Sequence, residues 1–280
     1  MLPHRLALLL SYRGDLWHGF ARQGDLPTVE NHLRQALGQV LGAAPWALVP
    51  AGRTDAGVHA LGQVVSFKTA APAPATSLPA AINACLPHGI WVRACTEVPR
   101  RFHARASARL RWYRYLVEDA ENPVTGETPR RSWRLPVRLD VDAMQQAAAC
   151  LRGRHDFTSF AMRPRENANN VCNIEELHVR HGGGLTVLDV RADRFLRRMV
   201  RTLVGTLVEV GSGERAAGDL DSALAARQRL AAGRTAPAHG LHLMRVLYDP
   251  DDLGVPAGER EGSGSSRPQS SLVSISTSCA

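Results

Sequence analysis

Apolar periodicity predicts that strands and helices alternate along this 280-residue chain, and that the alternation begins a second time near residue 105. The first series comprises strands at 6–12, 64–67 and 90–98 and helices at 27–41 and 78–85. The second comprises strands at 109–118, 174–179, 185–190 and 241–248 and helices at 141–151, 195–210 and 220–230. Because the two series have similar element content, we predict an α/β (α+β) fold with two related lobes, 1–105 and 106–250.

The remaining residues, 251–280, have a different composition. They contain eight serines with glycine and proline and show little apolar periodicity, which predicts a disordered tail. No run approaches the roughly eighteen apolar residues that span a bilayer, and the first residues are more typical of a strand than of a signal peptide. The five cysteines never form a C-x-x-C pair, so neither a disulfide framework nor a metal site is indicated, and a reducing cytoplasm fits best.

The charge of the protein indicates a polyanionic partner. Its net charge is +8 and its pI about 9.9, and all of its 34 basic residues except Lys68 are arginines. Seven arginines lie between Arg93 and Tyr115, with Phe102, Trp112 and Tyr113 among them. Arginines with interleaved aromatic residues are used to hold phosphates and stack bases, so we predict RNA or DNA binding. The alternative is a basic soluble protein without such a partner.

The segment 51–60, AGRTDAGVHA, places an arginine and an aspartate two residues apart between two apolar runs. A plain hairpin turn would use Asp-Gly or Asn-Gly, whereas Asp55 is followed by Ala56 and surrounded by small residues. This lack of bulk predicts that a substrate comes close to the Asp55 carboxylate. Arg53 either serves that substrate or is simply a solvent-exposed arginine of a turn.

The predicted helix 195–210 has a broad apolar face with arginines at its edge. Arg197 and Arg198 are explained as solvated residues of an amphipathic helix. Arg201 differs, because no other basic residue follows it before Gly211. If its guanidinium is buried it requires a carboxylate partner, for which Asp55 is a candidate that spacing alone cannot pair with it.

Five blocks of the sequence, spread over residues 5–248, resemble the tRNA pseudouridine synthase A family. The first is GRTDAGVHA at 52–60, which is the most specific. The others are FHAR at 102–105 with RWYRY at 111–115, DFTSF at 156–160, FLxxMVR at 195–201 and APAxGL at 236–241. They follow one another in the order that the family shows.

This resemblance implies a pseudouridine synthase fold, with two related lobes around a central antiparallel sheet and a basic cleft. It implies an enzyme that isomerises uridine to pseudouridine at positions 38, 39 and 40 of the tRNA anticodon stem-loop. Members act as homodimers, without a cofactor or a catalytic metal, and a cytoplasmic location is expected.

The resemblance also implies roles for individual residues. Asp55 matches the catalytic aspartate, which either attacks the sugar or abstracts its 2′ proton. Arg201 would keep that carboxylate ionised, and Tyr113 would stack on the uracil. Arg53 would occupy the place of the flipped uridine. The predicted RNA-binding residues are Arg53, Thr54, His59, Arg105, Arg111 and Tyr113.

Four departures from the family pattern occur, at Arg13, Phe20, Cys172 and Asp193. They concern RNA docking and target range rather than the reaction. Two alternatives stay open on the residues alone. One is a non-catalytic RNA-binding relative of this family. The other is an unrelated aspartate-dependent hydrolase, which the lack of a second carboxylate motif, a Ser-His arrangement or a phosphate loop disfavours.

Overall fold

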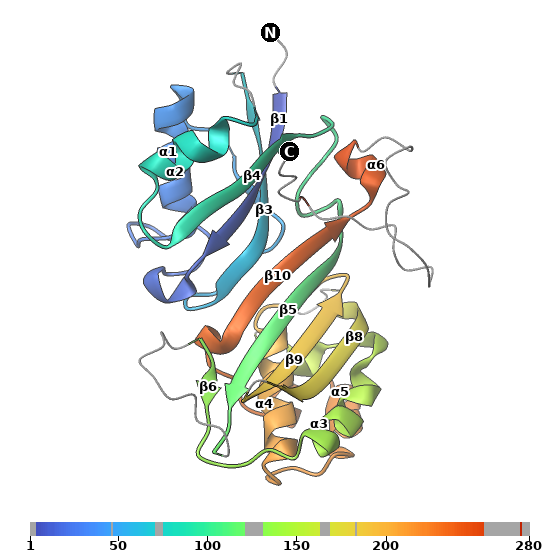
Figure 1. The fold of residues 1–280 in the computed structure, drawn as a ribbon. Coiled ribbons are helices and arrows are strands. Elements are labelled where there is room, and N and C mark those ends of the chain that lie inside the picture. The colour runs from blue at the N-terminus through green and yellow to red at the C-terminus, as the bar shows by residue number, and fades with distance from the viewer. Residues whose placement is uncertain are drawn as a thin grey trace. The chain divides into compact units, whose positions relative to one another are not determined.

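The computed structural model describes residues 4–45, 47–70, 75–120, 131–162, 169–182, 184–254 and 275. The protein forms two compact units, residues 1–110 with 243–280 and residues 111–242. Figure 1 labels their helices and strands along the sequence.

The first unit contains an antiparallel sheet with two helices. The strand order is β4 (Ile90–Glu97), β1 (His4–Tyr12), β3 (His59–Thr69) and β10 (Leu241–Tyr248), and the short β2 (Val49–Pro50) pairs with β3. β1 pairs antiparallel with both β3 and β4. Helices α1 (Val29–Leu41) and α2 (Leu78–Cys85) pack against each other, and α2 also packs against β4 (Figure 1).

The ends of α1 follow from local chemistry. The Thr28 side chain accepts a hydrogen bond from the Asn31 N–H at 3.3 Å and caps the first turn. Gly42 ends the helix with a φ of +74°, a left-handed conformation that favours glycine. Between these ends, Val29, Leu33 and Leu37 are buried along one face. The predicted helix therefore forms, beginning two residues after Pro27.

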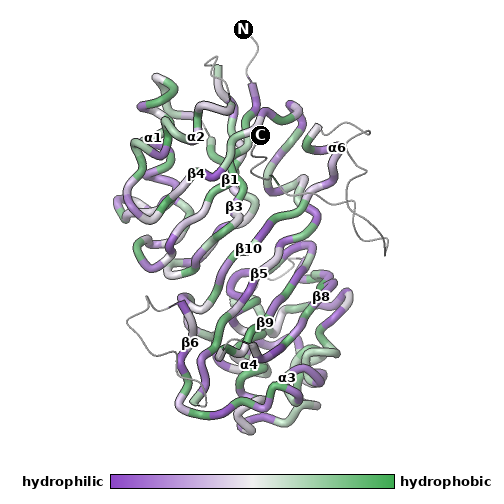
Figure 2. Tube along the Cα trace, in the orientation of Figure 1, coloured by the Kyte–Doolittle hydropathy of each residue, from purple (hydrophilic) through white to green (hydrophobic). Residues whose placement is uncertain are grey.

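In the second unit, too, most neighbouring strands run antiparallel. The strand order is β5 (Ala108–Glu118), β9 (Leu185–Ala192), β8 (Val171–Gly182) and β7 (Gly153–Asp156), and β6 (Trp133–Arg134) pairs parallel with β5. Polar and apolar residues alternate along β5, β8 and β9 in Figure 2, as expected for strands with one buried face. The helices are α3 (Val141–Ala147), α4 (Met199–Gly211) and α5 (Asp219–Ala226), and α3 packs against α4 and β8.

Helix α4 forms the centre of the second unit. Eleven of its thirteen residues are buried, and the two exceptions are Arg201 and Glu209. The sequence predicted that this helix begins at Phe195, but it begins at Met199. The reason is that Arg198 adopts a left-handed φ of +58°, while the Arg197 C=O accepts the Met162 N–H at 2.9 Å.

Two other predicted helices are also shorter than expected. α5 ends at Ala226 because Arg227 has a left-handed φ of +50° and the next N–H, that of Gln228, donates to Ser159 Oγ at 2.8 Å. α3 ends at Ala147, and residues 148–151 continue as a 3₁₀ turn. The predicted strands all form, and several extend further than the periodicity indicated.

The division into units differs from the predicted lobes 1–105 and 106–250. The first unit extends to Leu110, and it also includes the residues from Leu243 on. Contacts within the first unit explain this return: the Tyr248 hydroxyl donates to the Ala104 C=O at 2.9 Å, and its ring centroid lies 5.1 Å from that of Phe102. Periodicity along the sequence does not reveal such a return.

The predicted tail, 251–280, is described only in part. Residues 251–253 belong to a short helix, α6 (Pro250–Leu253), so regular structure continues past the predicted boundary. Ile275 is buried, and the other residues from 255 onwards lie outside the described ranges. Within those ranges, none of the helices is both long and apolar enough to cross a membrane.

Candidate active site

The segment that bears Asp55 connects β2 to β3 and is held against residues 14–20 in the first unit. The Phe20 N–H donates to the Thr54 C=O at 3.1 Å, and the Gly57 N–H donates to the Gly14 C=O at 3.2 Å. Gly14 and Gly19 permit this approach: an added Cβ would lie 2.1 Å from the Val58 oxygen at Gly14 and 2.9 Å from the Thr54 oxygen at Gly19. The two segments therefore fit together only with glycine at both positions.

A buried network fixes the same loop from the side of the sheet. The Tyr12 and Thr54 hydroxyls are hydrogen bonded at 2.8 Å, and the Gln63 side-chain amide donates to the Gly52 C=O at 2.7 Å. Burial raises the pKa of Tyr12 to about 12, so its phenol stays protonated. Thr54 was predicted to bind RNA. Its side chain is buried and hydrogen bonded to Tyr12, so Thr54 supports the loop.

His59, which was also predicted to bind RNA, supports the loop as well. Its side chain is buried, and its Nδ1 accepts the Gly14 N–H at 3.1 Å and lies 3.9 Å from Asp15 Oδ1. Arg13, one of the departures from the family pattern, pairs with Asp15 at 2.5 Å, and this bond holds the pKa of Asp15 below its usual range. The side chain of Arg13 is therefore paired within the segment that holds the loop.

Two charged side chains of this loop are accessible. Arg53 is exposed and Asp55 is partly exposed, while their neighbour Thr54 is buried. The Asp55 C=O accepts the Val58 N–H at 3.2 Å, so the backbone of Asp55 forms part of a turn. Hydrogen bonds thus fix the backbone of the loop, while the Asp55 carboxylate and the Arg53 guanidinium stay accessible.

The other predicted catalytic residues lie in the second unit. Tyr113 lies on β5 with 8% of its surface exposed, and the edge of its ring meets Phe195 at a centroid distance of 5.3 Å. Arg201 lies in the first turn of α4, and its Nε donates to the Ala236 C=O at 2.7 Å. Phe195 belongs to the family block at 195–201 and contacts Tyr113. Ala236 belongs to the block at 236–241 and is hydrogen bonded to Arg201.

The two remaining predicted RNA-binding arginines differ in their surroundings. Arg105 is exposed in a turn of the first unit, where its N–H donates to His103 Nδ1 at 3.3 Å. Arg111 on β5 is half-buried and donates to the Asp193 C=O. The Asp193 carboxylate in turn accepts the Asn173 N–H at 2.8 Å. Asp193, a departure from the family pattern, thus organises the end of β9.

Comparison with known proteins shows which family this chain belongs to. A family profile described as tRNA pseudouridine synthase matches residues 147–249. The tRNA pseudouridine synthase A of Bacillus licheniformis is 39% identical over 249 residues, which cover 88% of this chain and 99% of that protein. Those of Brevibacillus brevis and Moorella thermoacetica are 42% and 43% identical over 246 residues, each covering 87% of this chain and 99% of the relative. The chain belongs to the tRNA pseudouridine synthase A family.

Membership confirms the predicted family, the predicted fold class and the prediction that the protein is an enzyme. The hydrolase alternative is wrong. In this tRNA pseudouridine synthase A family member, the most specific motif lies on the Asp55 loop of the first unit, and three further blocks lie in the second unit.

The basic stretch from Arg93 to Arg114 was predicted to combine phosphate binding with base stacking, and the second part needs correction. Phe102 and Tyr115 are fully buried, and Tyr113 nearly so, because these rings form the cores of the two units. Of the aromatic residues in and beside this stretch, Trp112 is partly exposed. The exposed arginines, all in the first unit, are Arg93, Arg100, Arg101, Arg105 and Arg109. Apart from Trp112 and Tyr113, this stretch therefore offers charge rather than stacking platforms.

Replacing Tyr12 by phenylalanine tests whether the buried network matters for turnover. Tyr12→Phe removes the bond to Thr54, and we expect a loss of about 1 kcal/mol in the free energy of unfolding. Tyr248→Phe is the matched control, because its hydroxyl is also buried and donates to a backbone C=O far along the sequence from the loop. Urea unfolding should show similar losses for both variants, whereas pseudouridine formation should slow only in Tyr12→Phe. Equal turnover in the two variants would show that the network does not position Asp55.

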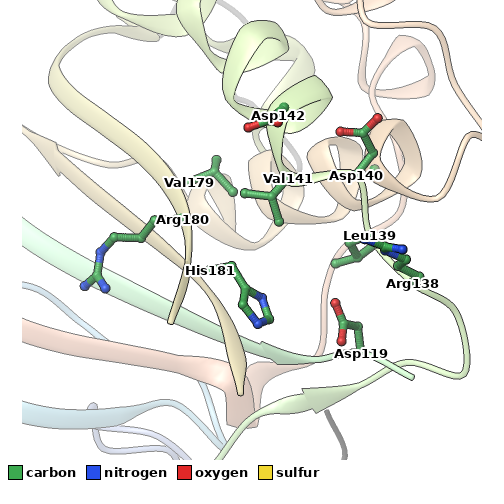
Figure 3. A pocket seen from close by; sticks show the side chains of 10 residues that line it. Asp119, Arg138, Leu139, Asp140, Val141, Asp142, Val179, Arg180 and His181 are labelled. Carbon is green, nitrogen blue, oxygen red and sulfur yellow. The ribbon is translucent and has the colours of Figure 1, made fainter. Parts of the chain in front are cut away.

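A hollow of about 850 Å³ opens in the second unit (Figure 3). Its lining bears both signs of charge and comprises Asp119, residues 138–142, residues 179–181 and Gly211. Gly211 lies ten residues after Arg201, which corresponds to about 15 Å along α4. No sequence pattern predicted this hollow, because its lining comes from separate segments. Within the described ranges, no group of three or more His, Cys, Asp or Glu side chains could hold a metal ion.

Proposed function

We propose that this protein isomerises uridine to pseudouridine at positions 38, 39 and 40 of the tRNA anticodon stem-loop. Family membership supports the reaction and the tRNA substrate, and the motif resemblance supports the three positions. The single observation that carries the proposal is the Asp55 loop, which has the family's most specific motif and holds a partly exposed carboxylate on a rigid backbone.

Asp55 is proposed as the catalytic residue. In the reaction the N1–C1′ bond of uridine breaks, the uracil turns, a C1′–C5 bond forms and the C5 proton leaves. An ionised carboxylate next to the sugar assists either by attacking C1′ or by taking the 2′ proton. Both roles require close contact with the ribose, and the small residues around Asp55 permit such contact.

Arg201 and Tyr113 are proposed to act on the same uridine. A guanidinium beside Asp55 would favour the charged carboxylate and so keep it ready to react. Tyr113 would stack on the uracil, and its phenol could help to remove the C5 proton. These two residues lie in the second unit and Asp55 in the first, and their joint action rests on the match to the family's motifs.

RNA binding is proposed for the accessible basic residues. A uridine stacked in a stem must be flipped out, at a cost of a few kcal/mol, before Asp55 can reach its sugar. Arg53, which is exposed beside Asp55, would fill the vacated place. Arg105 and Arg111 would contact phosphates. We further propose that the protein acts as a homodimer in the cytoplasm and needs no cofactor.

The target positions can be tested with tRNA transcripts that carry [5-³H]uridine at a single one of positions 38, 39 and 40. We expect release of tritium from each of the three, and none from a transcript with cytidine at all three positions. Release from one transcript alone would narrow the target range. Binding of all transcripts without any release would favour the second candidate, a non-catalytic RNA-binding relative.

A further inference from the structure

The segment Gly233–Ala236 runs along helix α4, and we call it the strap. All four of its residues are hydrogen bonded to the helix. The bonds are Gly233 N–H to Thr206 Oγ1 at 2.9 Å, Arg234 N–H to Glu209 Oε1 at 2.7 Å, Thr235 Oγ1 with Thr202 Oγ1 at 3.3 Å, and Ala236 N–H to the Arg201 C=O at 3.0 Å. The strap is therefore fixed to successive turns of α4 rather than resting on its surface.

Two glycines allow the strap to lie this close to the helix. An added Cβ at Gly205 would lie 1.9 Å from the Arg234 oxygen, and one at Gly233 would lie 2.3 Å from the Glu209 carboxylate. Both distances are shorter than any real contact of a Cβ atom. Glycine thus stands on the helix where the strap backbone meets it, and on the strap where the Glu209 side chain meets it.

Arg201 is bonded to the strap twice. Its backbone C=O accepts the Ala236 N–H, and its side-chain Nε donates back to the Ala236 C=O at 2.7 Å. A guanidinium is planar and presents its donors in a fixed fork, so a bond at Nε sets the plane in which the two terminal nitrogens lie. The position of Ala236 therefore determines the direction of the Arg201 fork.

The strap continues into contacts with β5, the strand of Tyr113. The Tyr115 hydroxyl donates to the Pro237 C=O at 2.8 Å, and an added Cβ at Gly240 would lie 2.6 Å from the Tyr115 ring. Burial raises the pKa of Tyr115, and the positive charge of Arg201 partly opposes this rise. Tyr113 and Tyr115 project from the same face of β5, since they are two residues apart. The residues that follow the strap thus connect it to the strand that bears Tyr113.

We propose that the strap orients the Arg201 guanidinium for the reaction, and that Thr206 is a positioning residue that acts through it. The inference rests on the proposed function, because it assumes that Arg201 takes part in turnover. Thr206 is fully buried, and its hydroxyl donates to the Thr202 C=O at 2.8 Å while it accepts the Gly233 N–H. It lies five residues after Arg201 on α4, about 7.5 Å along the axis, and its hydroxyl meets the strap at Gly233.

Thr206→Val and Thr206→Ser separate the hydroxyl from the shape of the side chain. Valine fills the same space but leaves the Gly233 N–H without its acceptor, whereas serine keeps the acceptor. A displacement of about 1 Å can lower a rate about 100-fold, so we expect kcat for tritium release to fall between about 10- and 100-fold in Thr206→Val. KM for tRNA should not change, and Thr206→Ser should stay close to the wild-type kcat.

A control and a second readout keep this test independent of general destabilisation. Thr186→Val is the control, because Thr186 is also fully buried in the second unit and its hydroxyl has no hydrogen-bond partner among the described residues. It should leave kcat unchanged. Amide hydrogen exchange of Gly233 and Ala236 should become faster in Thr206→Val while the amides of α1 keep their rates.

An unchanged kcat in a folded Thr206→Val, with wild-type tRNA turnover intact, would overturn the strap proposal and leave the proposed function standing. If Thr206→Val does not fold, Thr202→Val serves instead: a lower kcat with faster exchange at Ala236 supports the proposal, and unchanged values for both refute it. If the wild-type protein releases no tritium, the proposed function fails. Unchanged exchange at Gly233 and Ala236 in the variant would then show separately that Thr206 does not hold the strap.

Discussion

Asp55→Asn is expected to abolish release of tritium from tRNA that carries [5-³H]uridine, while tRNA binding remains. Asparagine keeps the size of the side chain but has no negative charge, so it can neither attack the sugar nor accept its 2′ proton. The loop should keep its structure, because its backbone is held by the hydrogen bonds of Phe20 and Gly57 and by the Tyr12–Thr54 pair. Turnover is measured by tritium release and affinity by filter binding.

Asp25→Asn provides the matched control for this experiment. Asp25 is an exposed aspartate in a turn of the same unit, outside the Asp55 loop and the segment that clasps it. Its conversion to asparagine should leave both turnover and tRNA binding at the wild-type level. Full turnover by Asp55→Asn, once mass spectrometry has excluded deamidation, would end the assignment of Asp55 as nucleophile or base.

Gly205→Ala is expected to destabilise the second unit although alanine favours helices. The gain in helix propensity is about 1 kcal/mol. Against it, the new methyl group would lie 1.9 Å from the Arg234 oxygen, which is a backbone atom that cannot rotate away. Overpacking of this kind costs about 1–3 kcal/mol and sometimes more, so we expect a net loss of free energy of unfolding in urea. Because the strap must shift, turnover should fall as well.

Gly218→Ala is the matched control, because the same substitution there brings the new methyl group into contact with no other atom. Gly218 precedes α5 with a φ of −67°, and no atom lies within 4 Å of an added Cβ. This variant should be as stable as the wild type or more stable by about 0.4–1 kcal/mol, with normal turnover. Equal stability of Gly205→Ala and Gly218→Ala would contradict the close seating of the strap on α4.

Local elements were predictable where their signals are local. α1 has a capping threonine and a terminal glycine on either side of a periodic apolar face, and α2 and β10 have the predicted bounds. The start of α4 was not predictable from periodicity, because the apolar spacing continues back to Phe195 while the left-handed Arg198 interrupts the helix. The return of the backbone from Leu243 to the first unit depends on contacts between residues distant in sequence, such as Tyr248 with Ala104.

The site was predictable by residue type but less well by role. The motif around Asp55 identified the loop, but it did not reveal that Thr54 and His59 are buried supports of that loop. A sequence motif does not distinguish a side chain that faces the substrate from one that faces the core. The partners that hold these two residues, Tyr12 and Gly14, come from a segment about 40 residues earlier. The strap could not be predicted from the sequence for the same reason, because it lies some 30 residues after the turns of α4 that it contacts.

The most direct test of the central claim compares two quantities in one reaction of the wild-type protein with [5-³H]uridine-labelled tRNA. One is the tritium released to water, and the other is the pseudouridine recovered from the tRNA by nucleoside analysis. Isomerisation frees one C5 hydrogen for each pseudouridine formed, so the account predicts equal amounts, in excess over the enzyme. Binding of the tRNA with neither tritium release nor pseudouridine would contradict it.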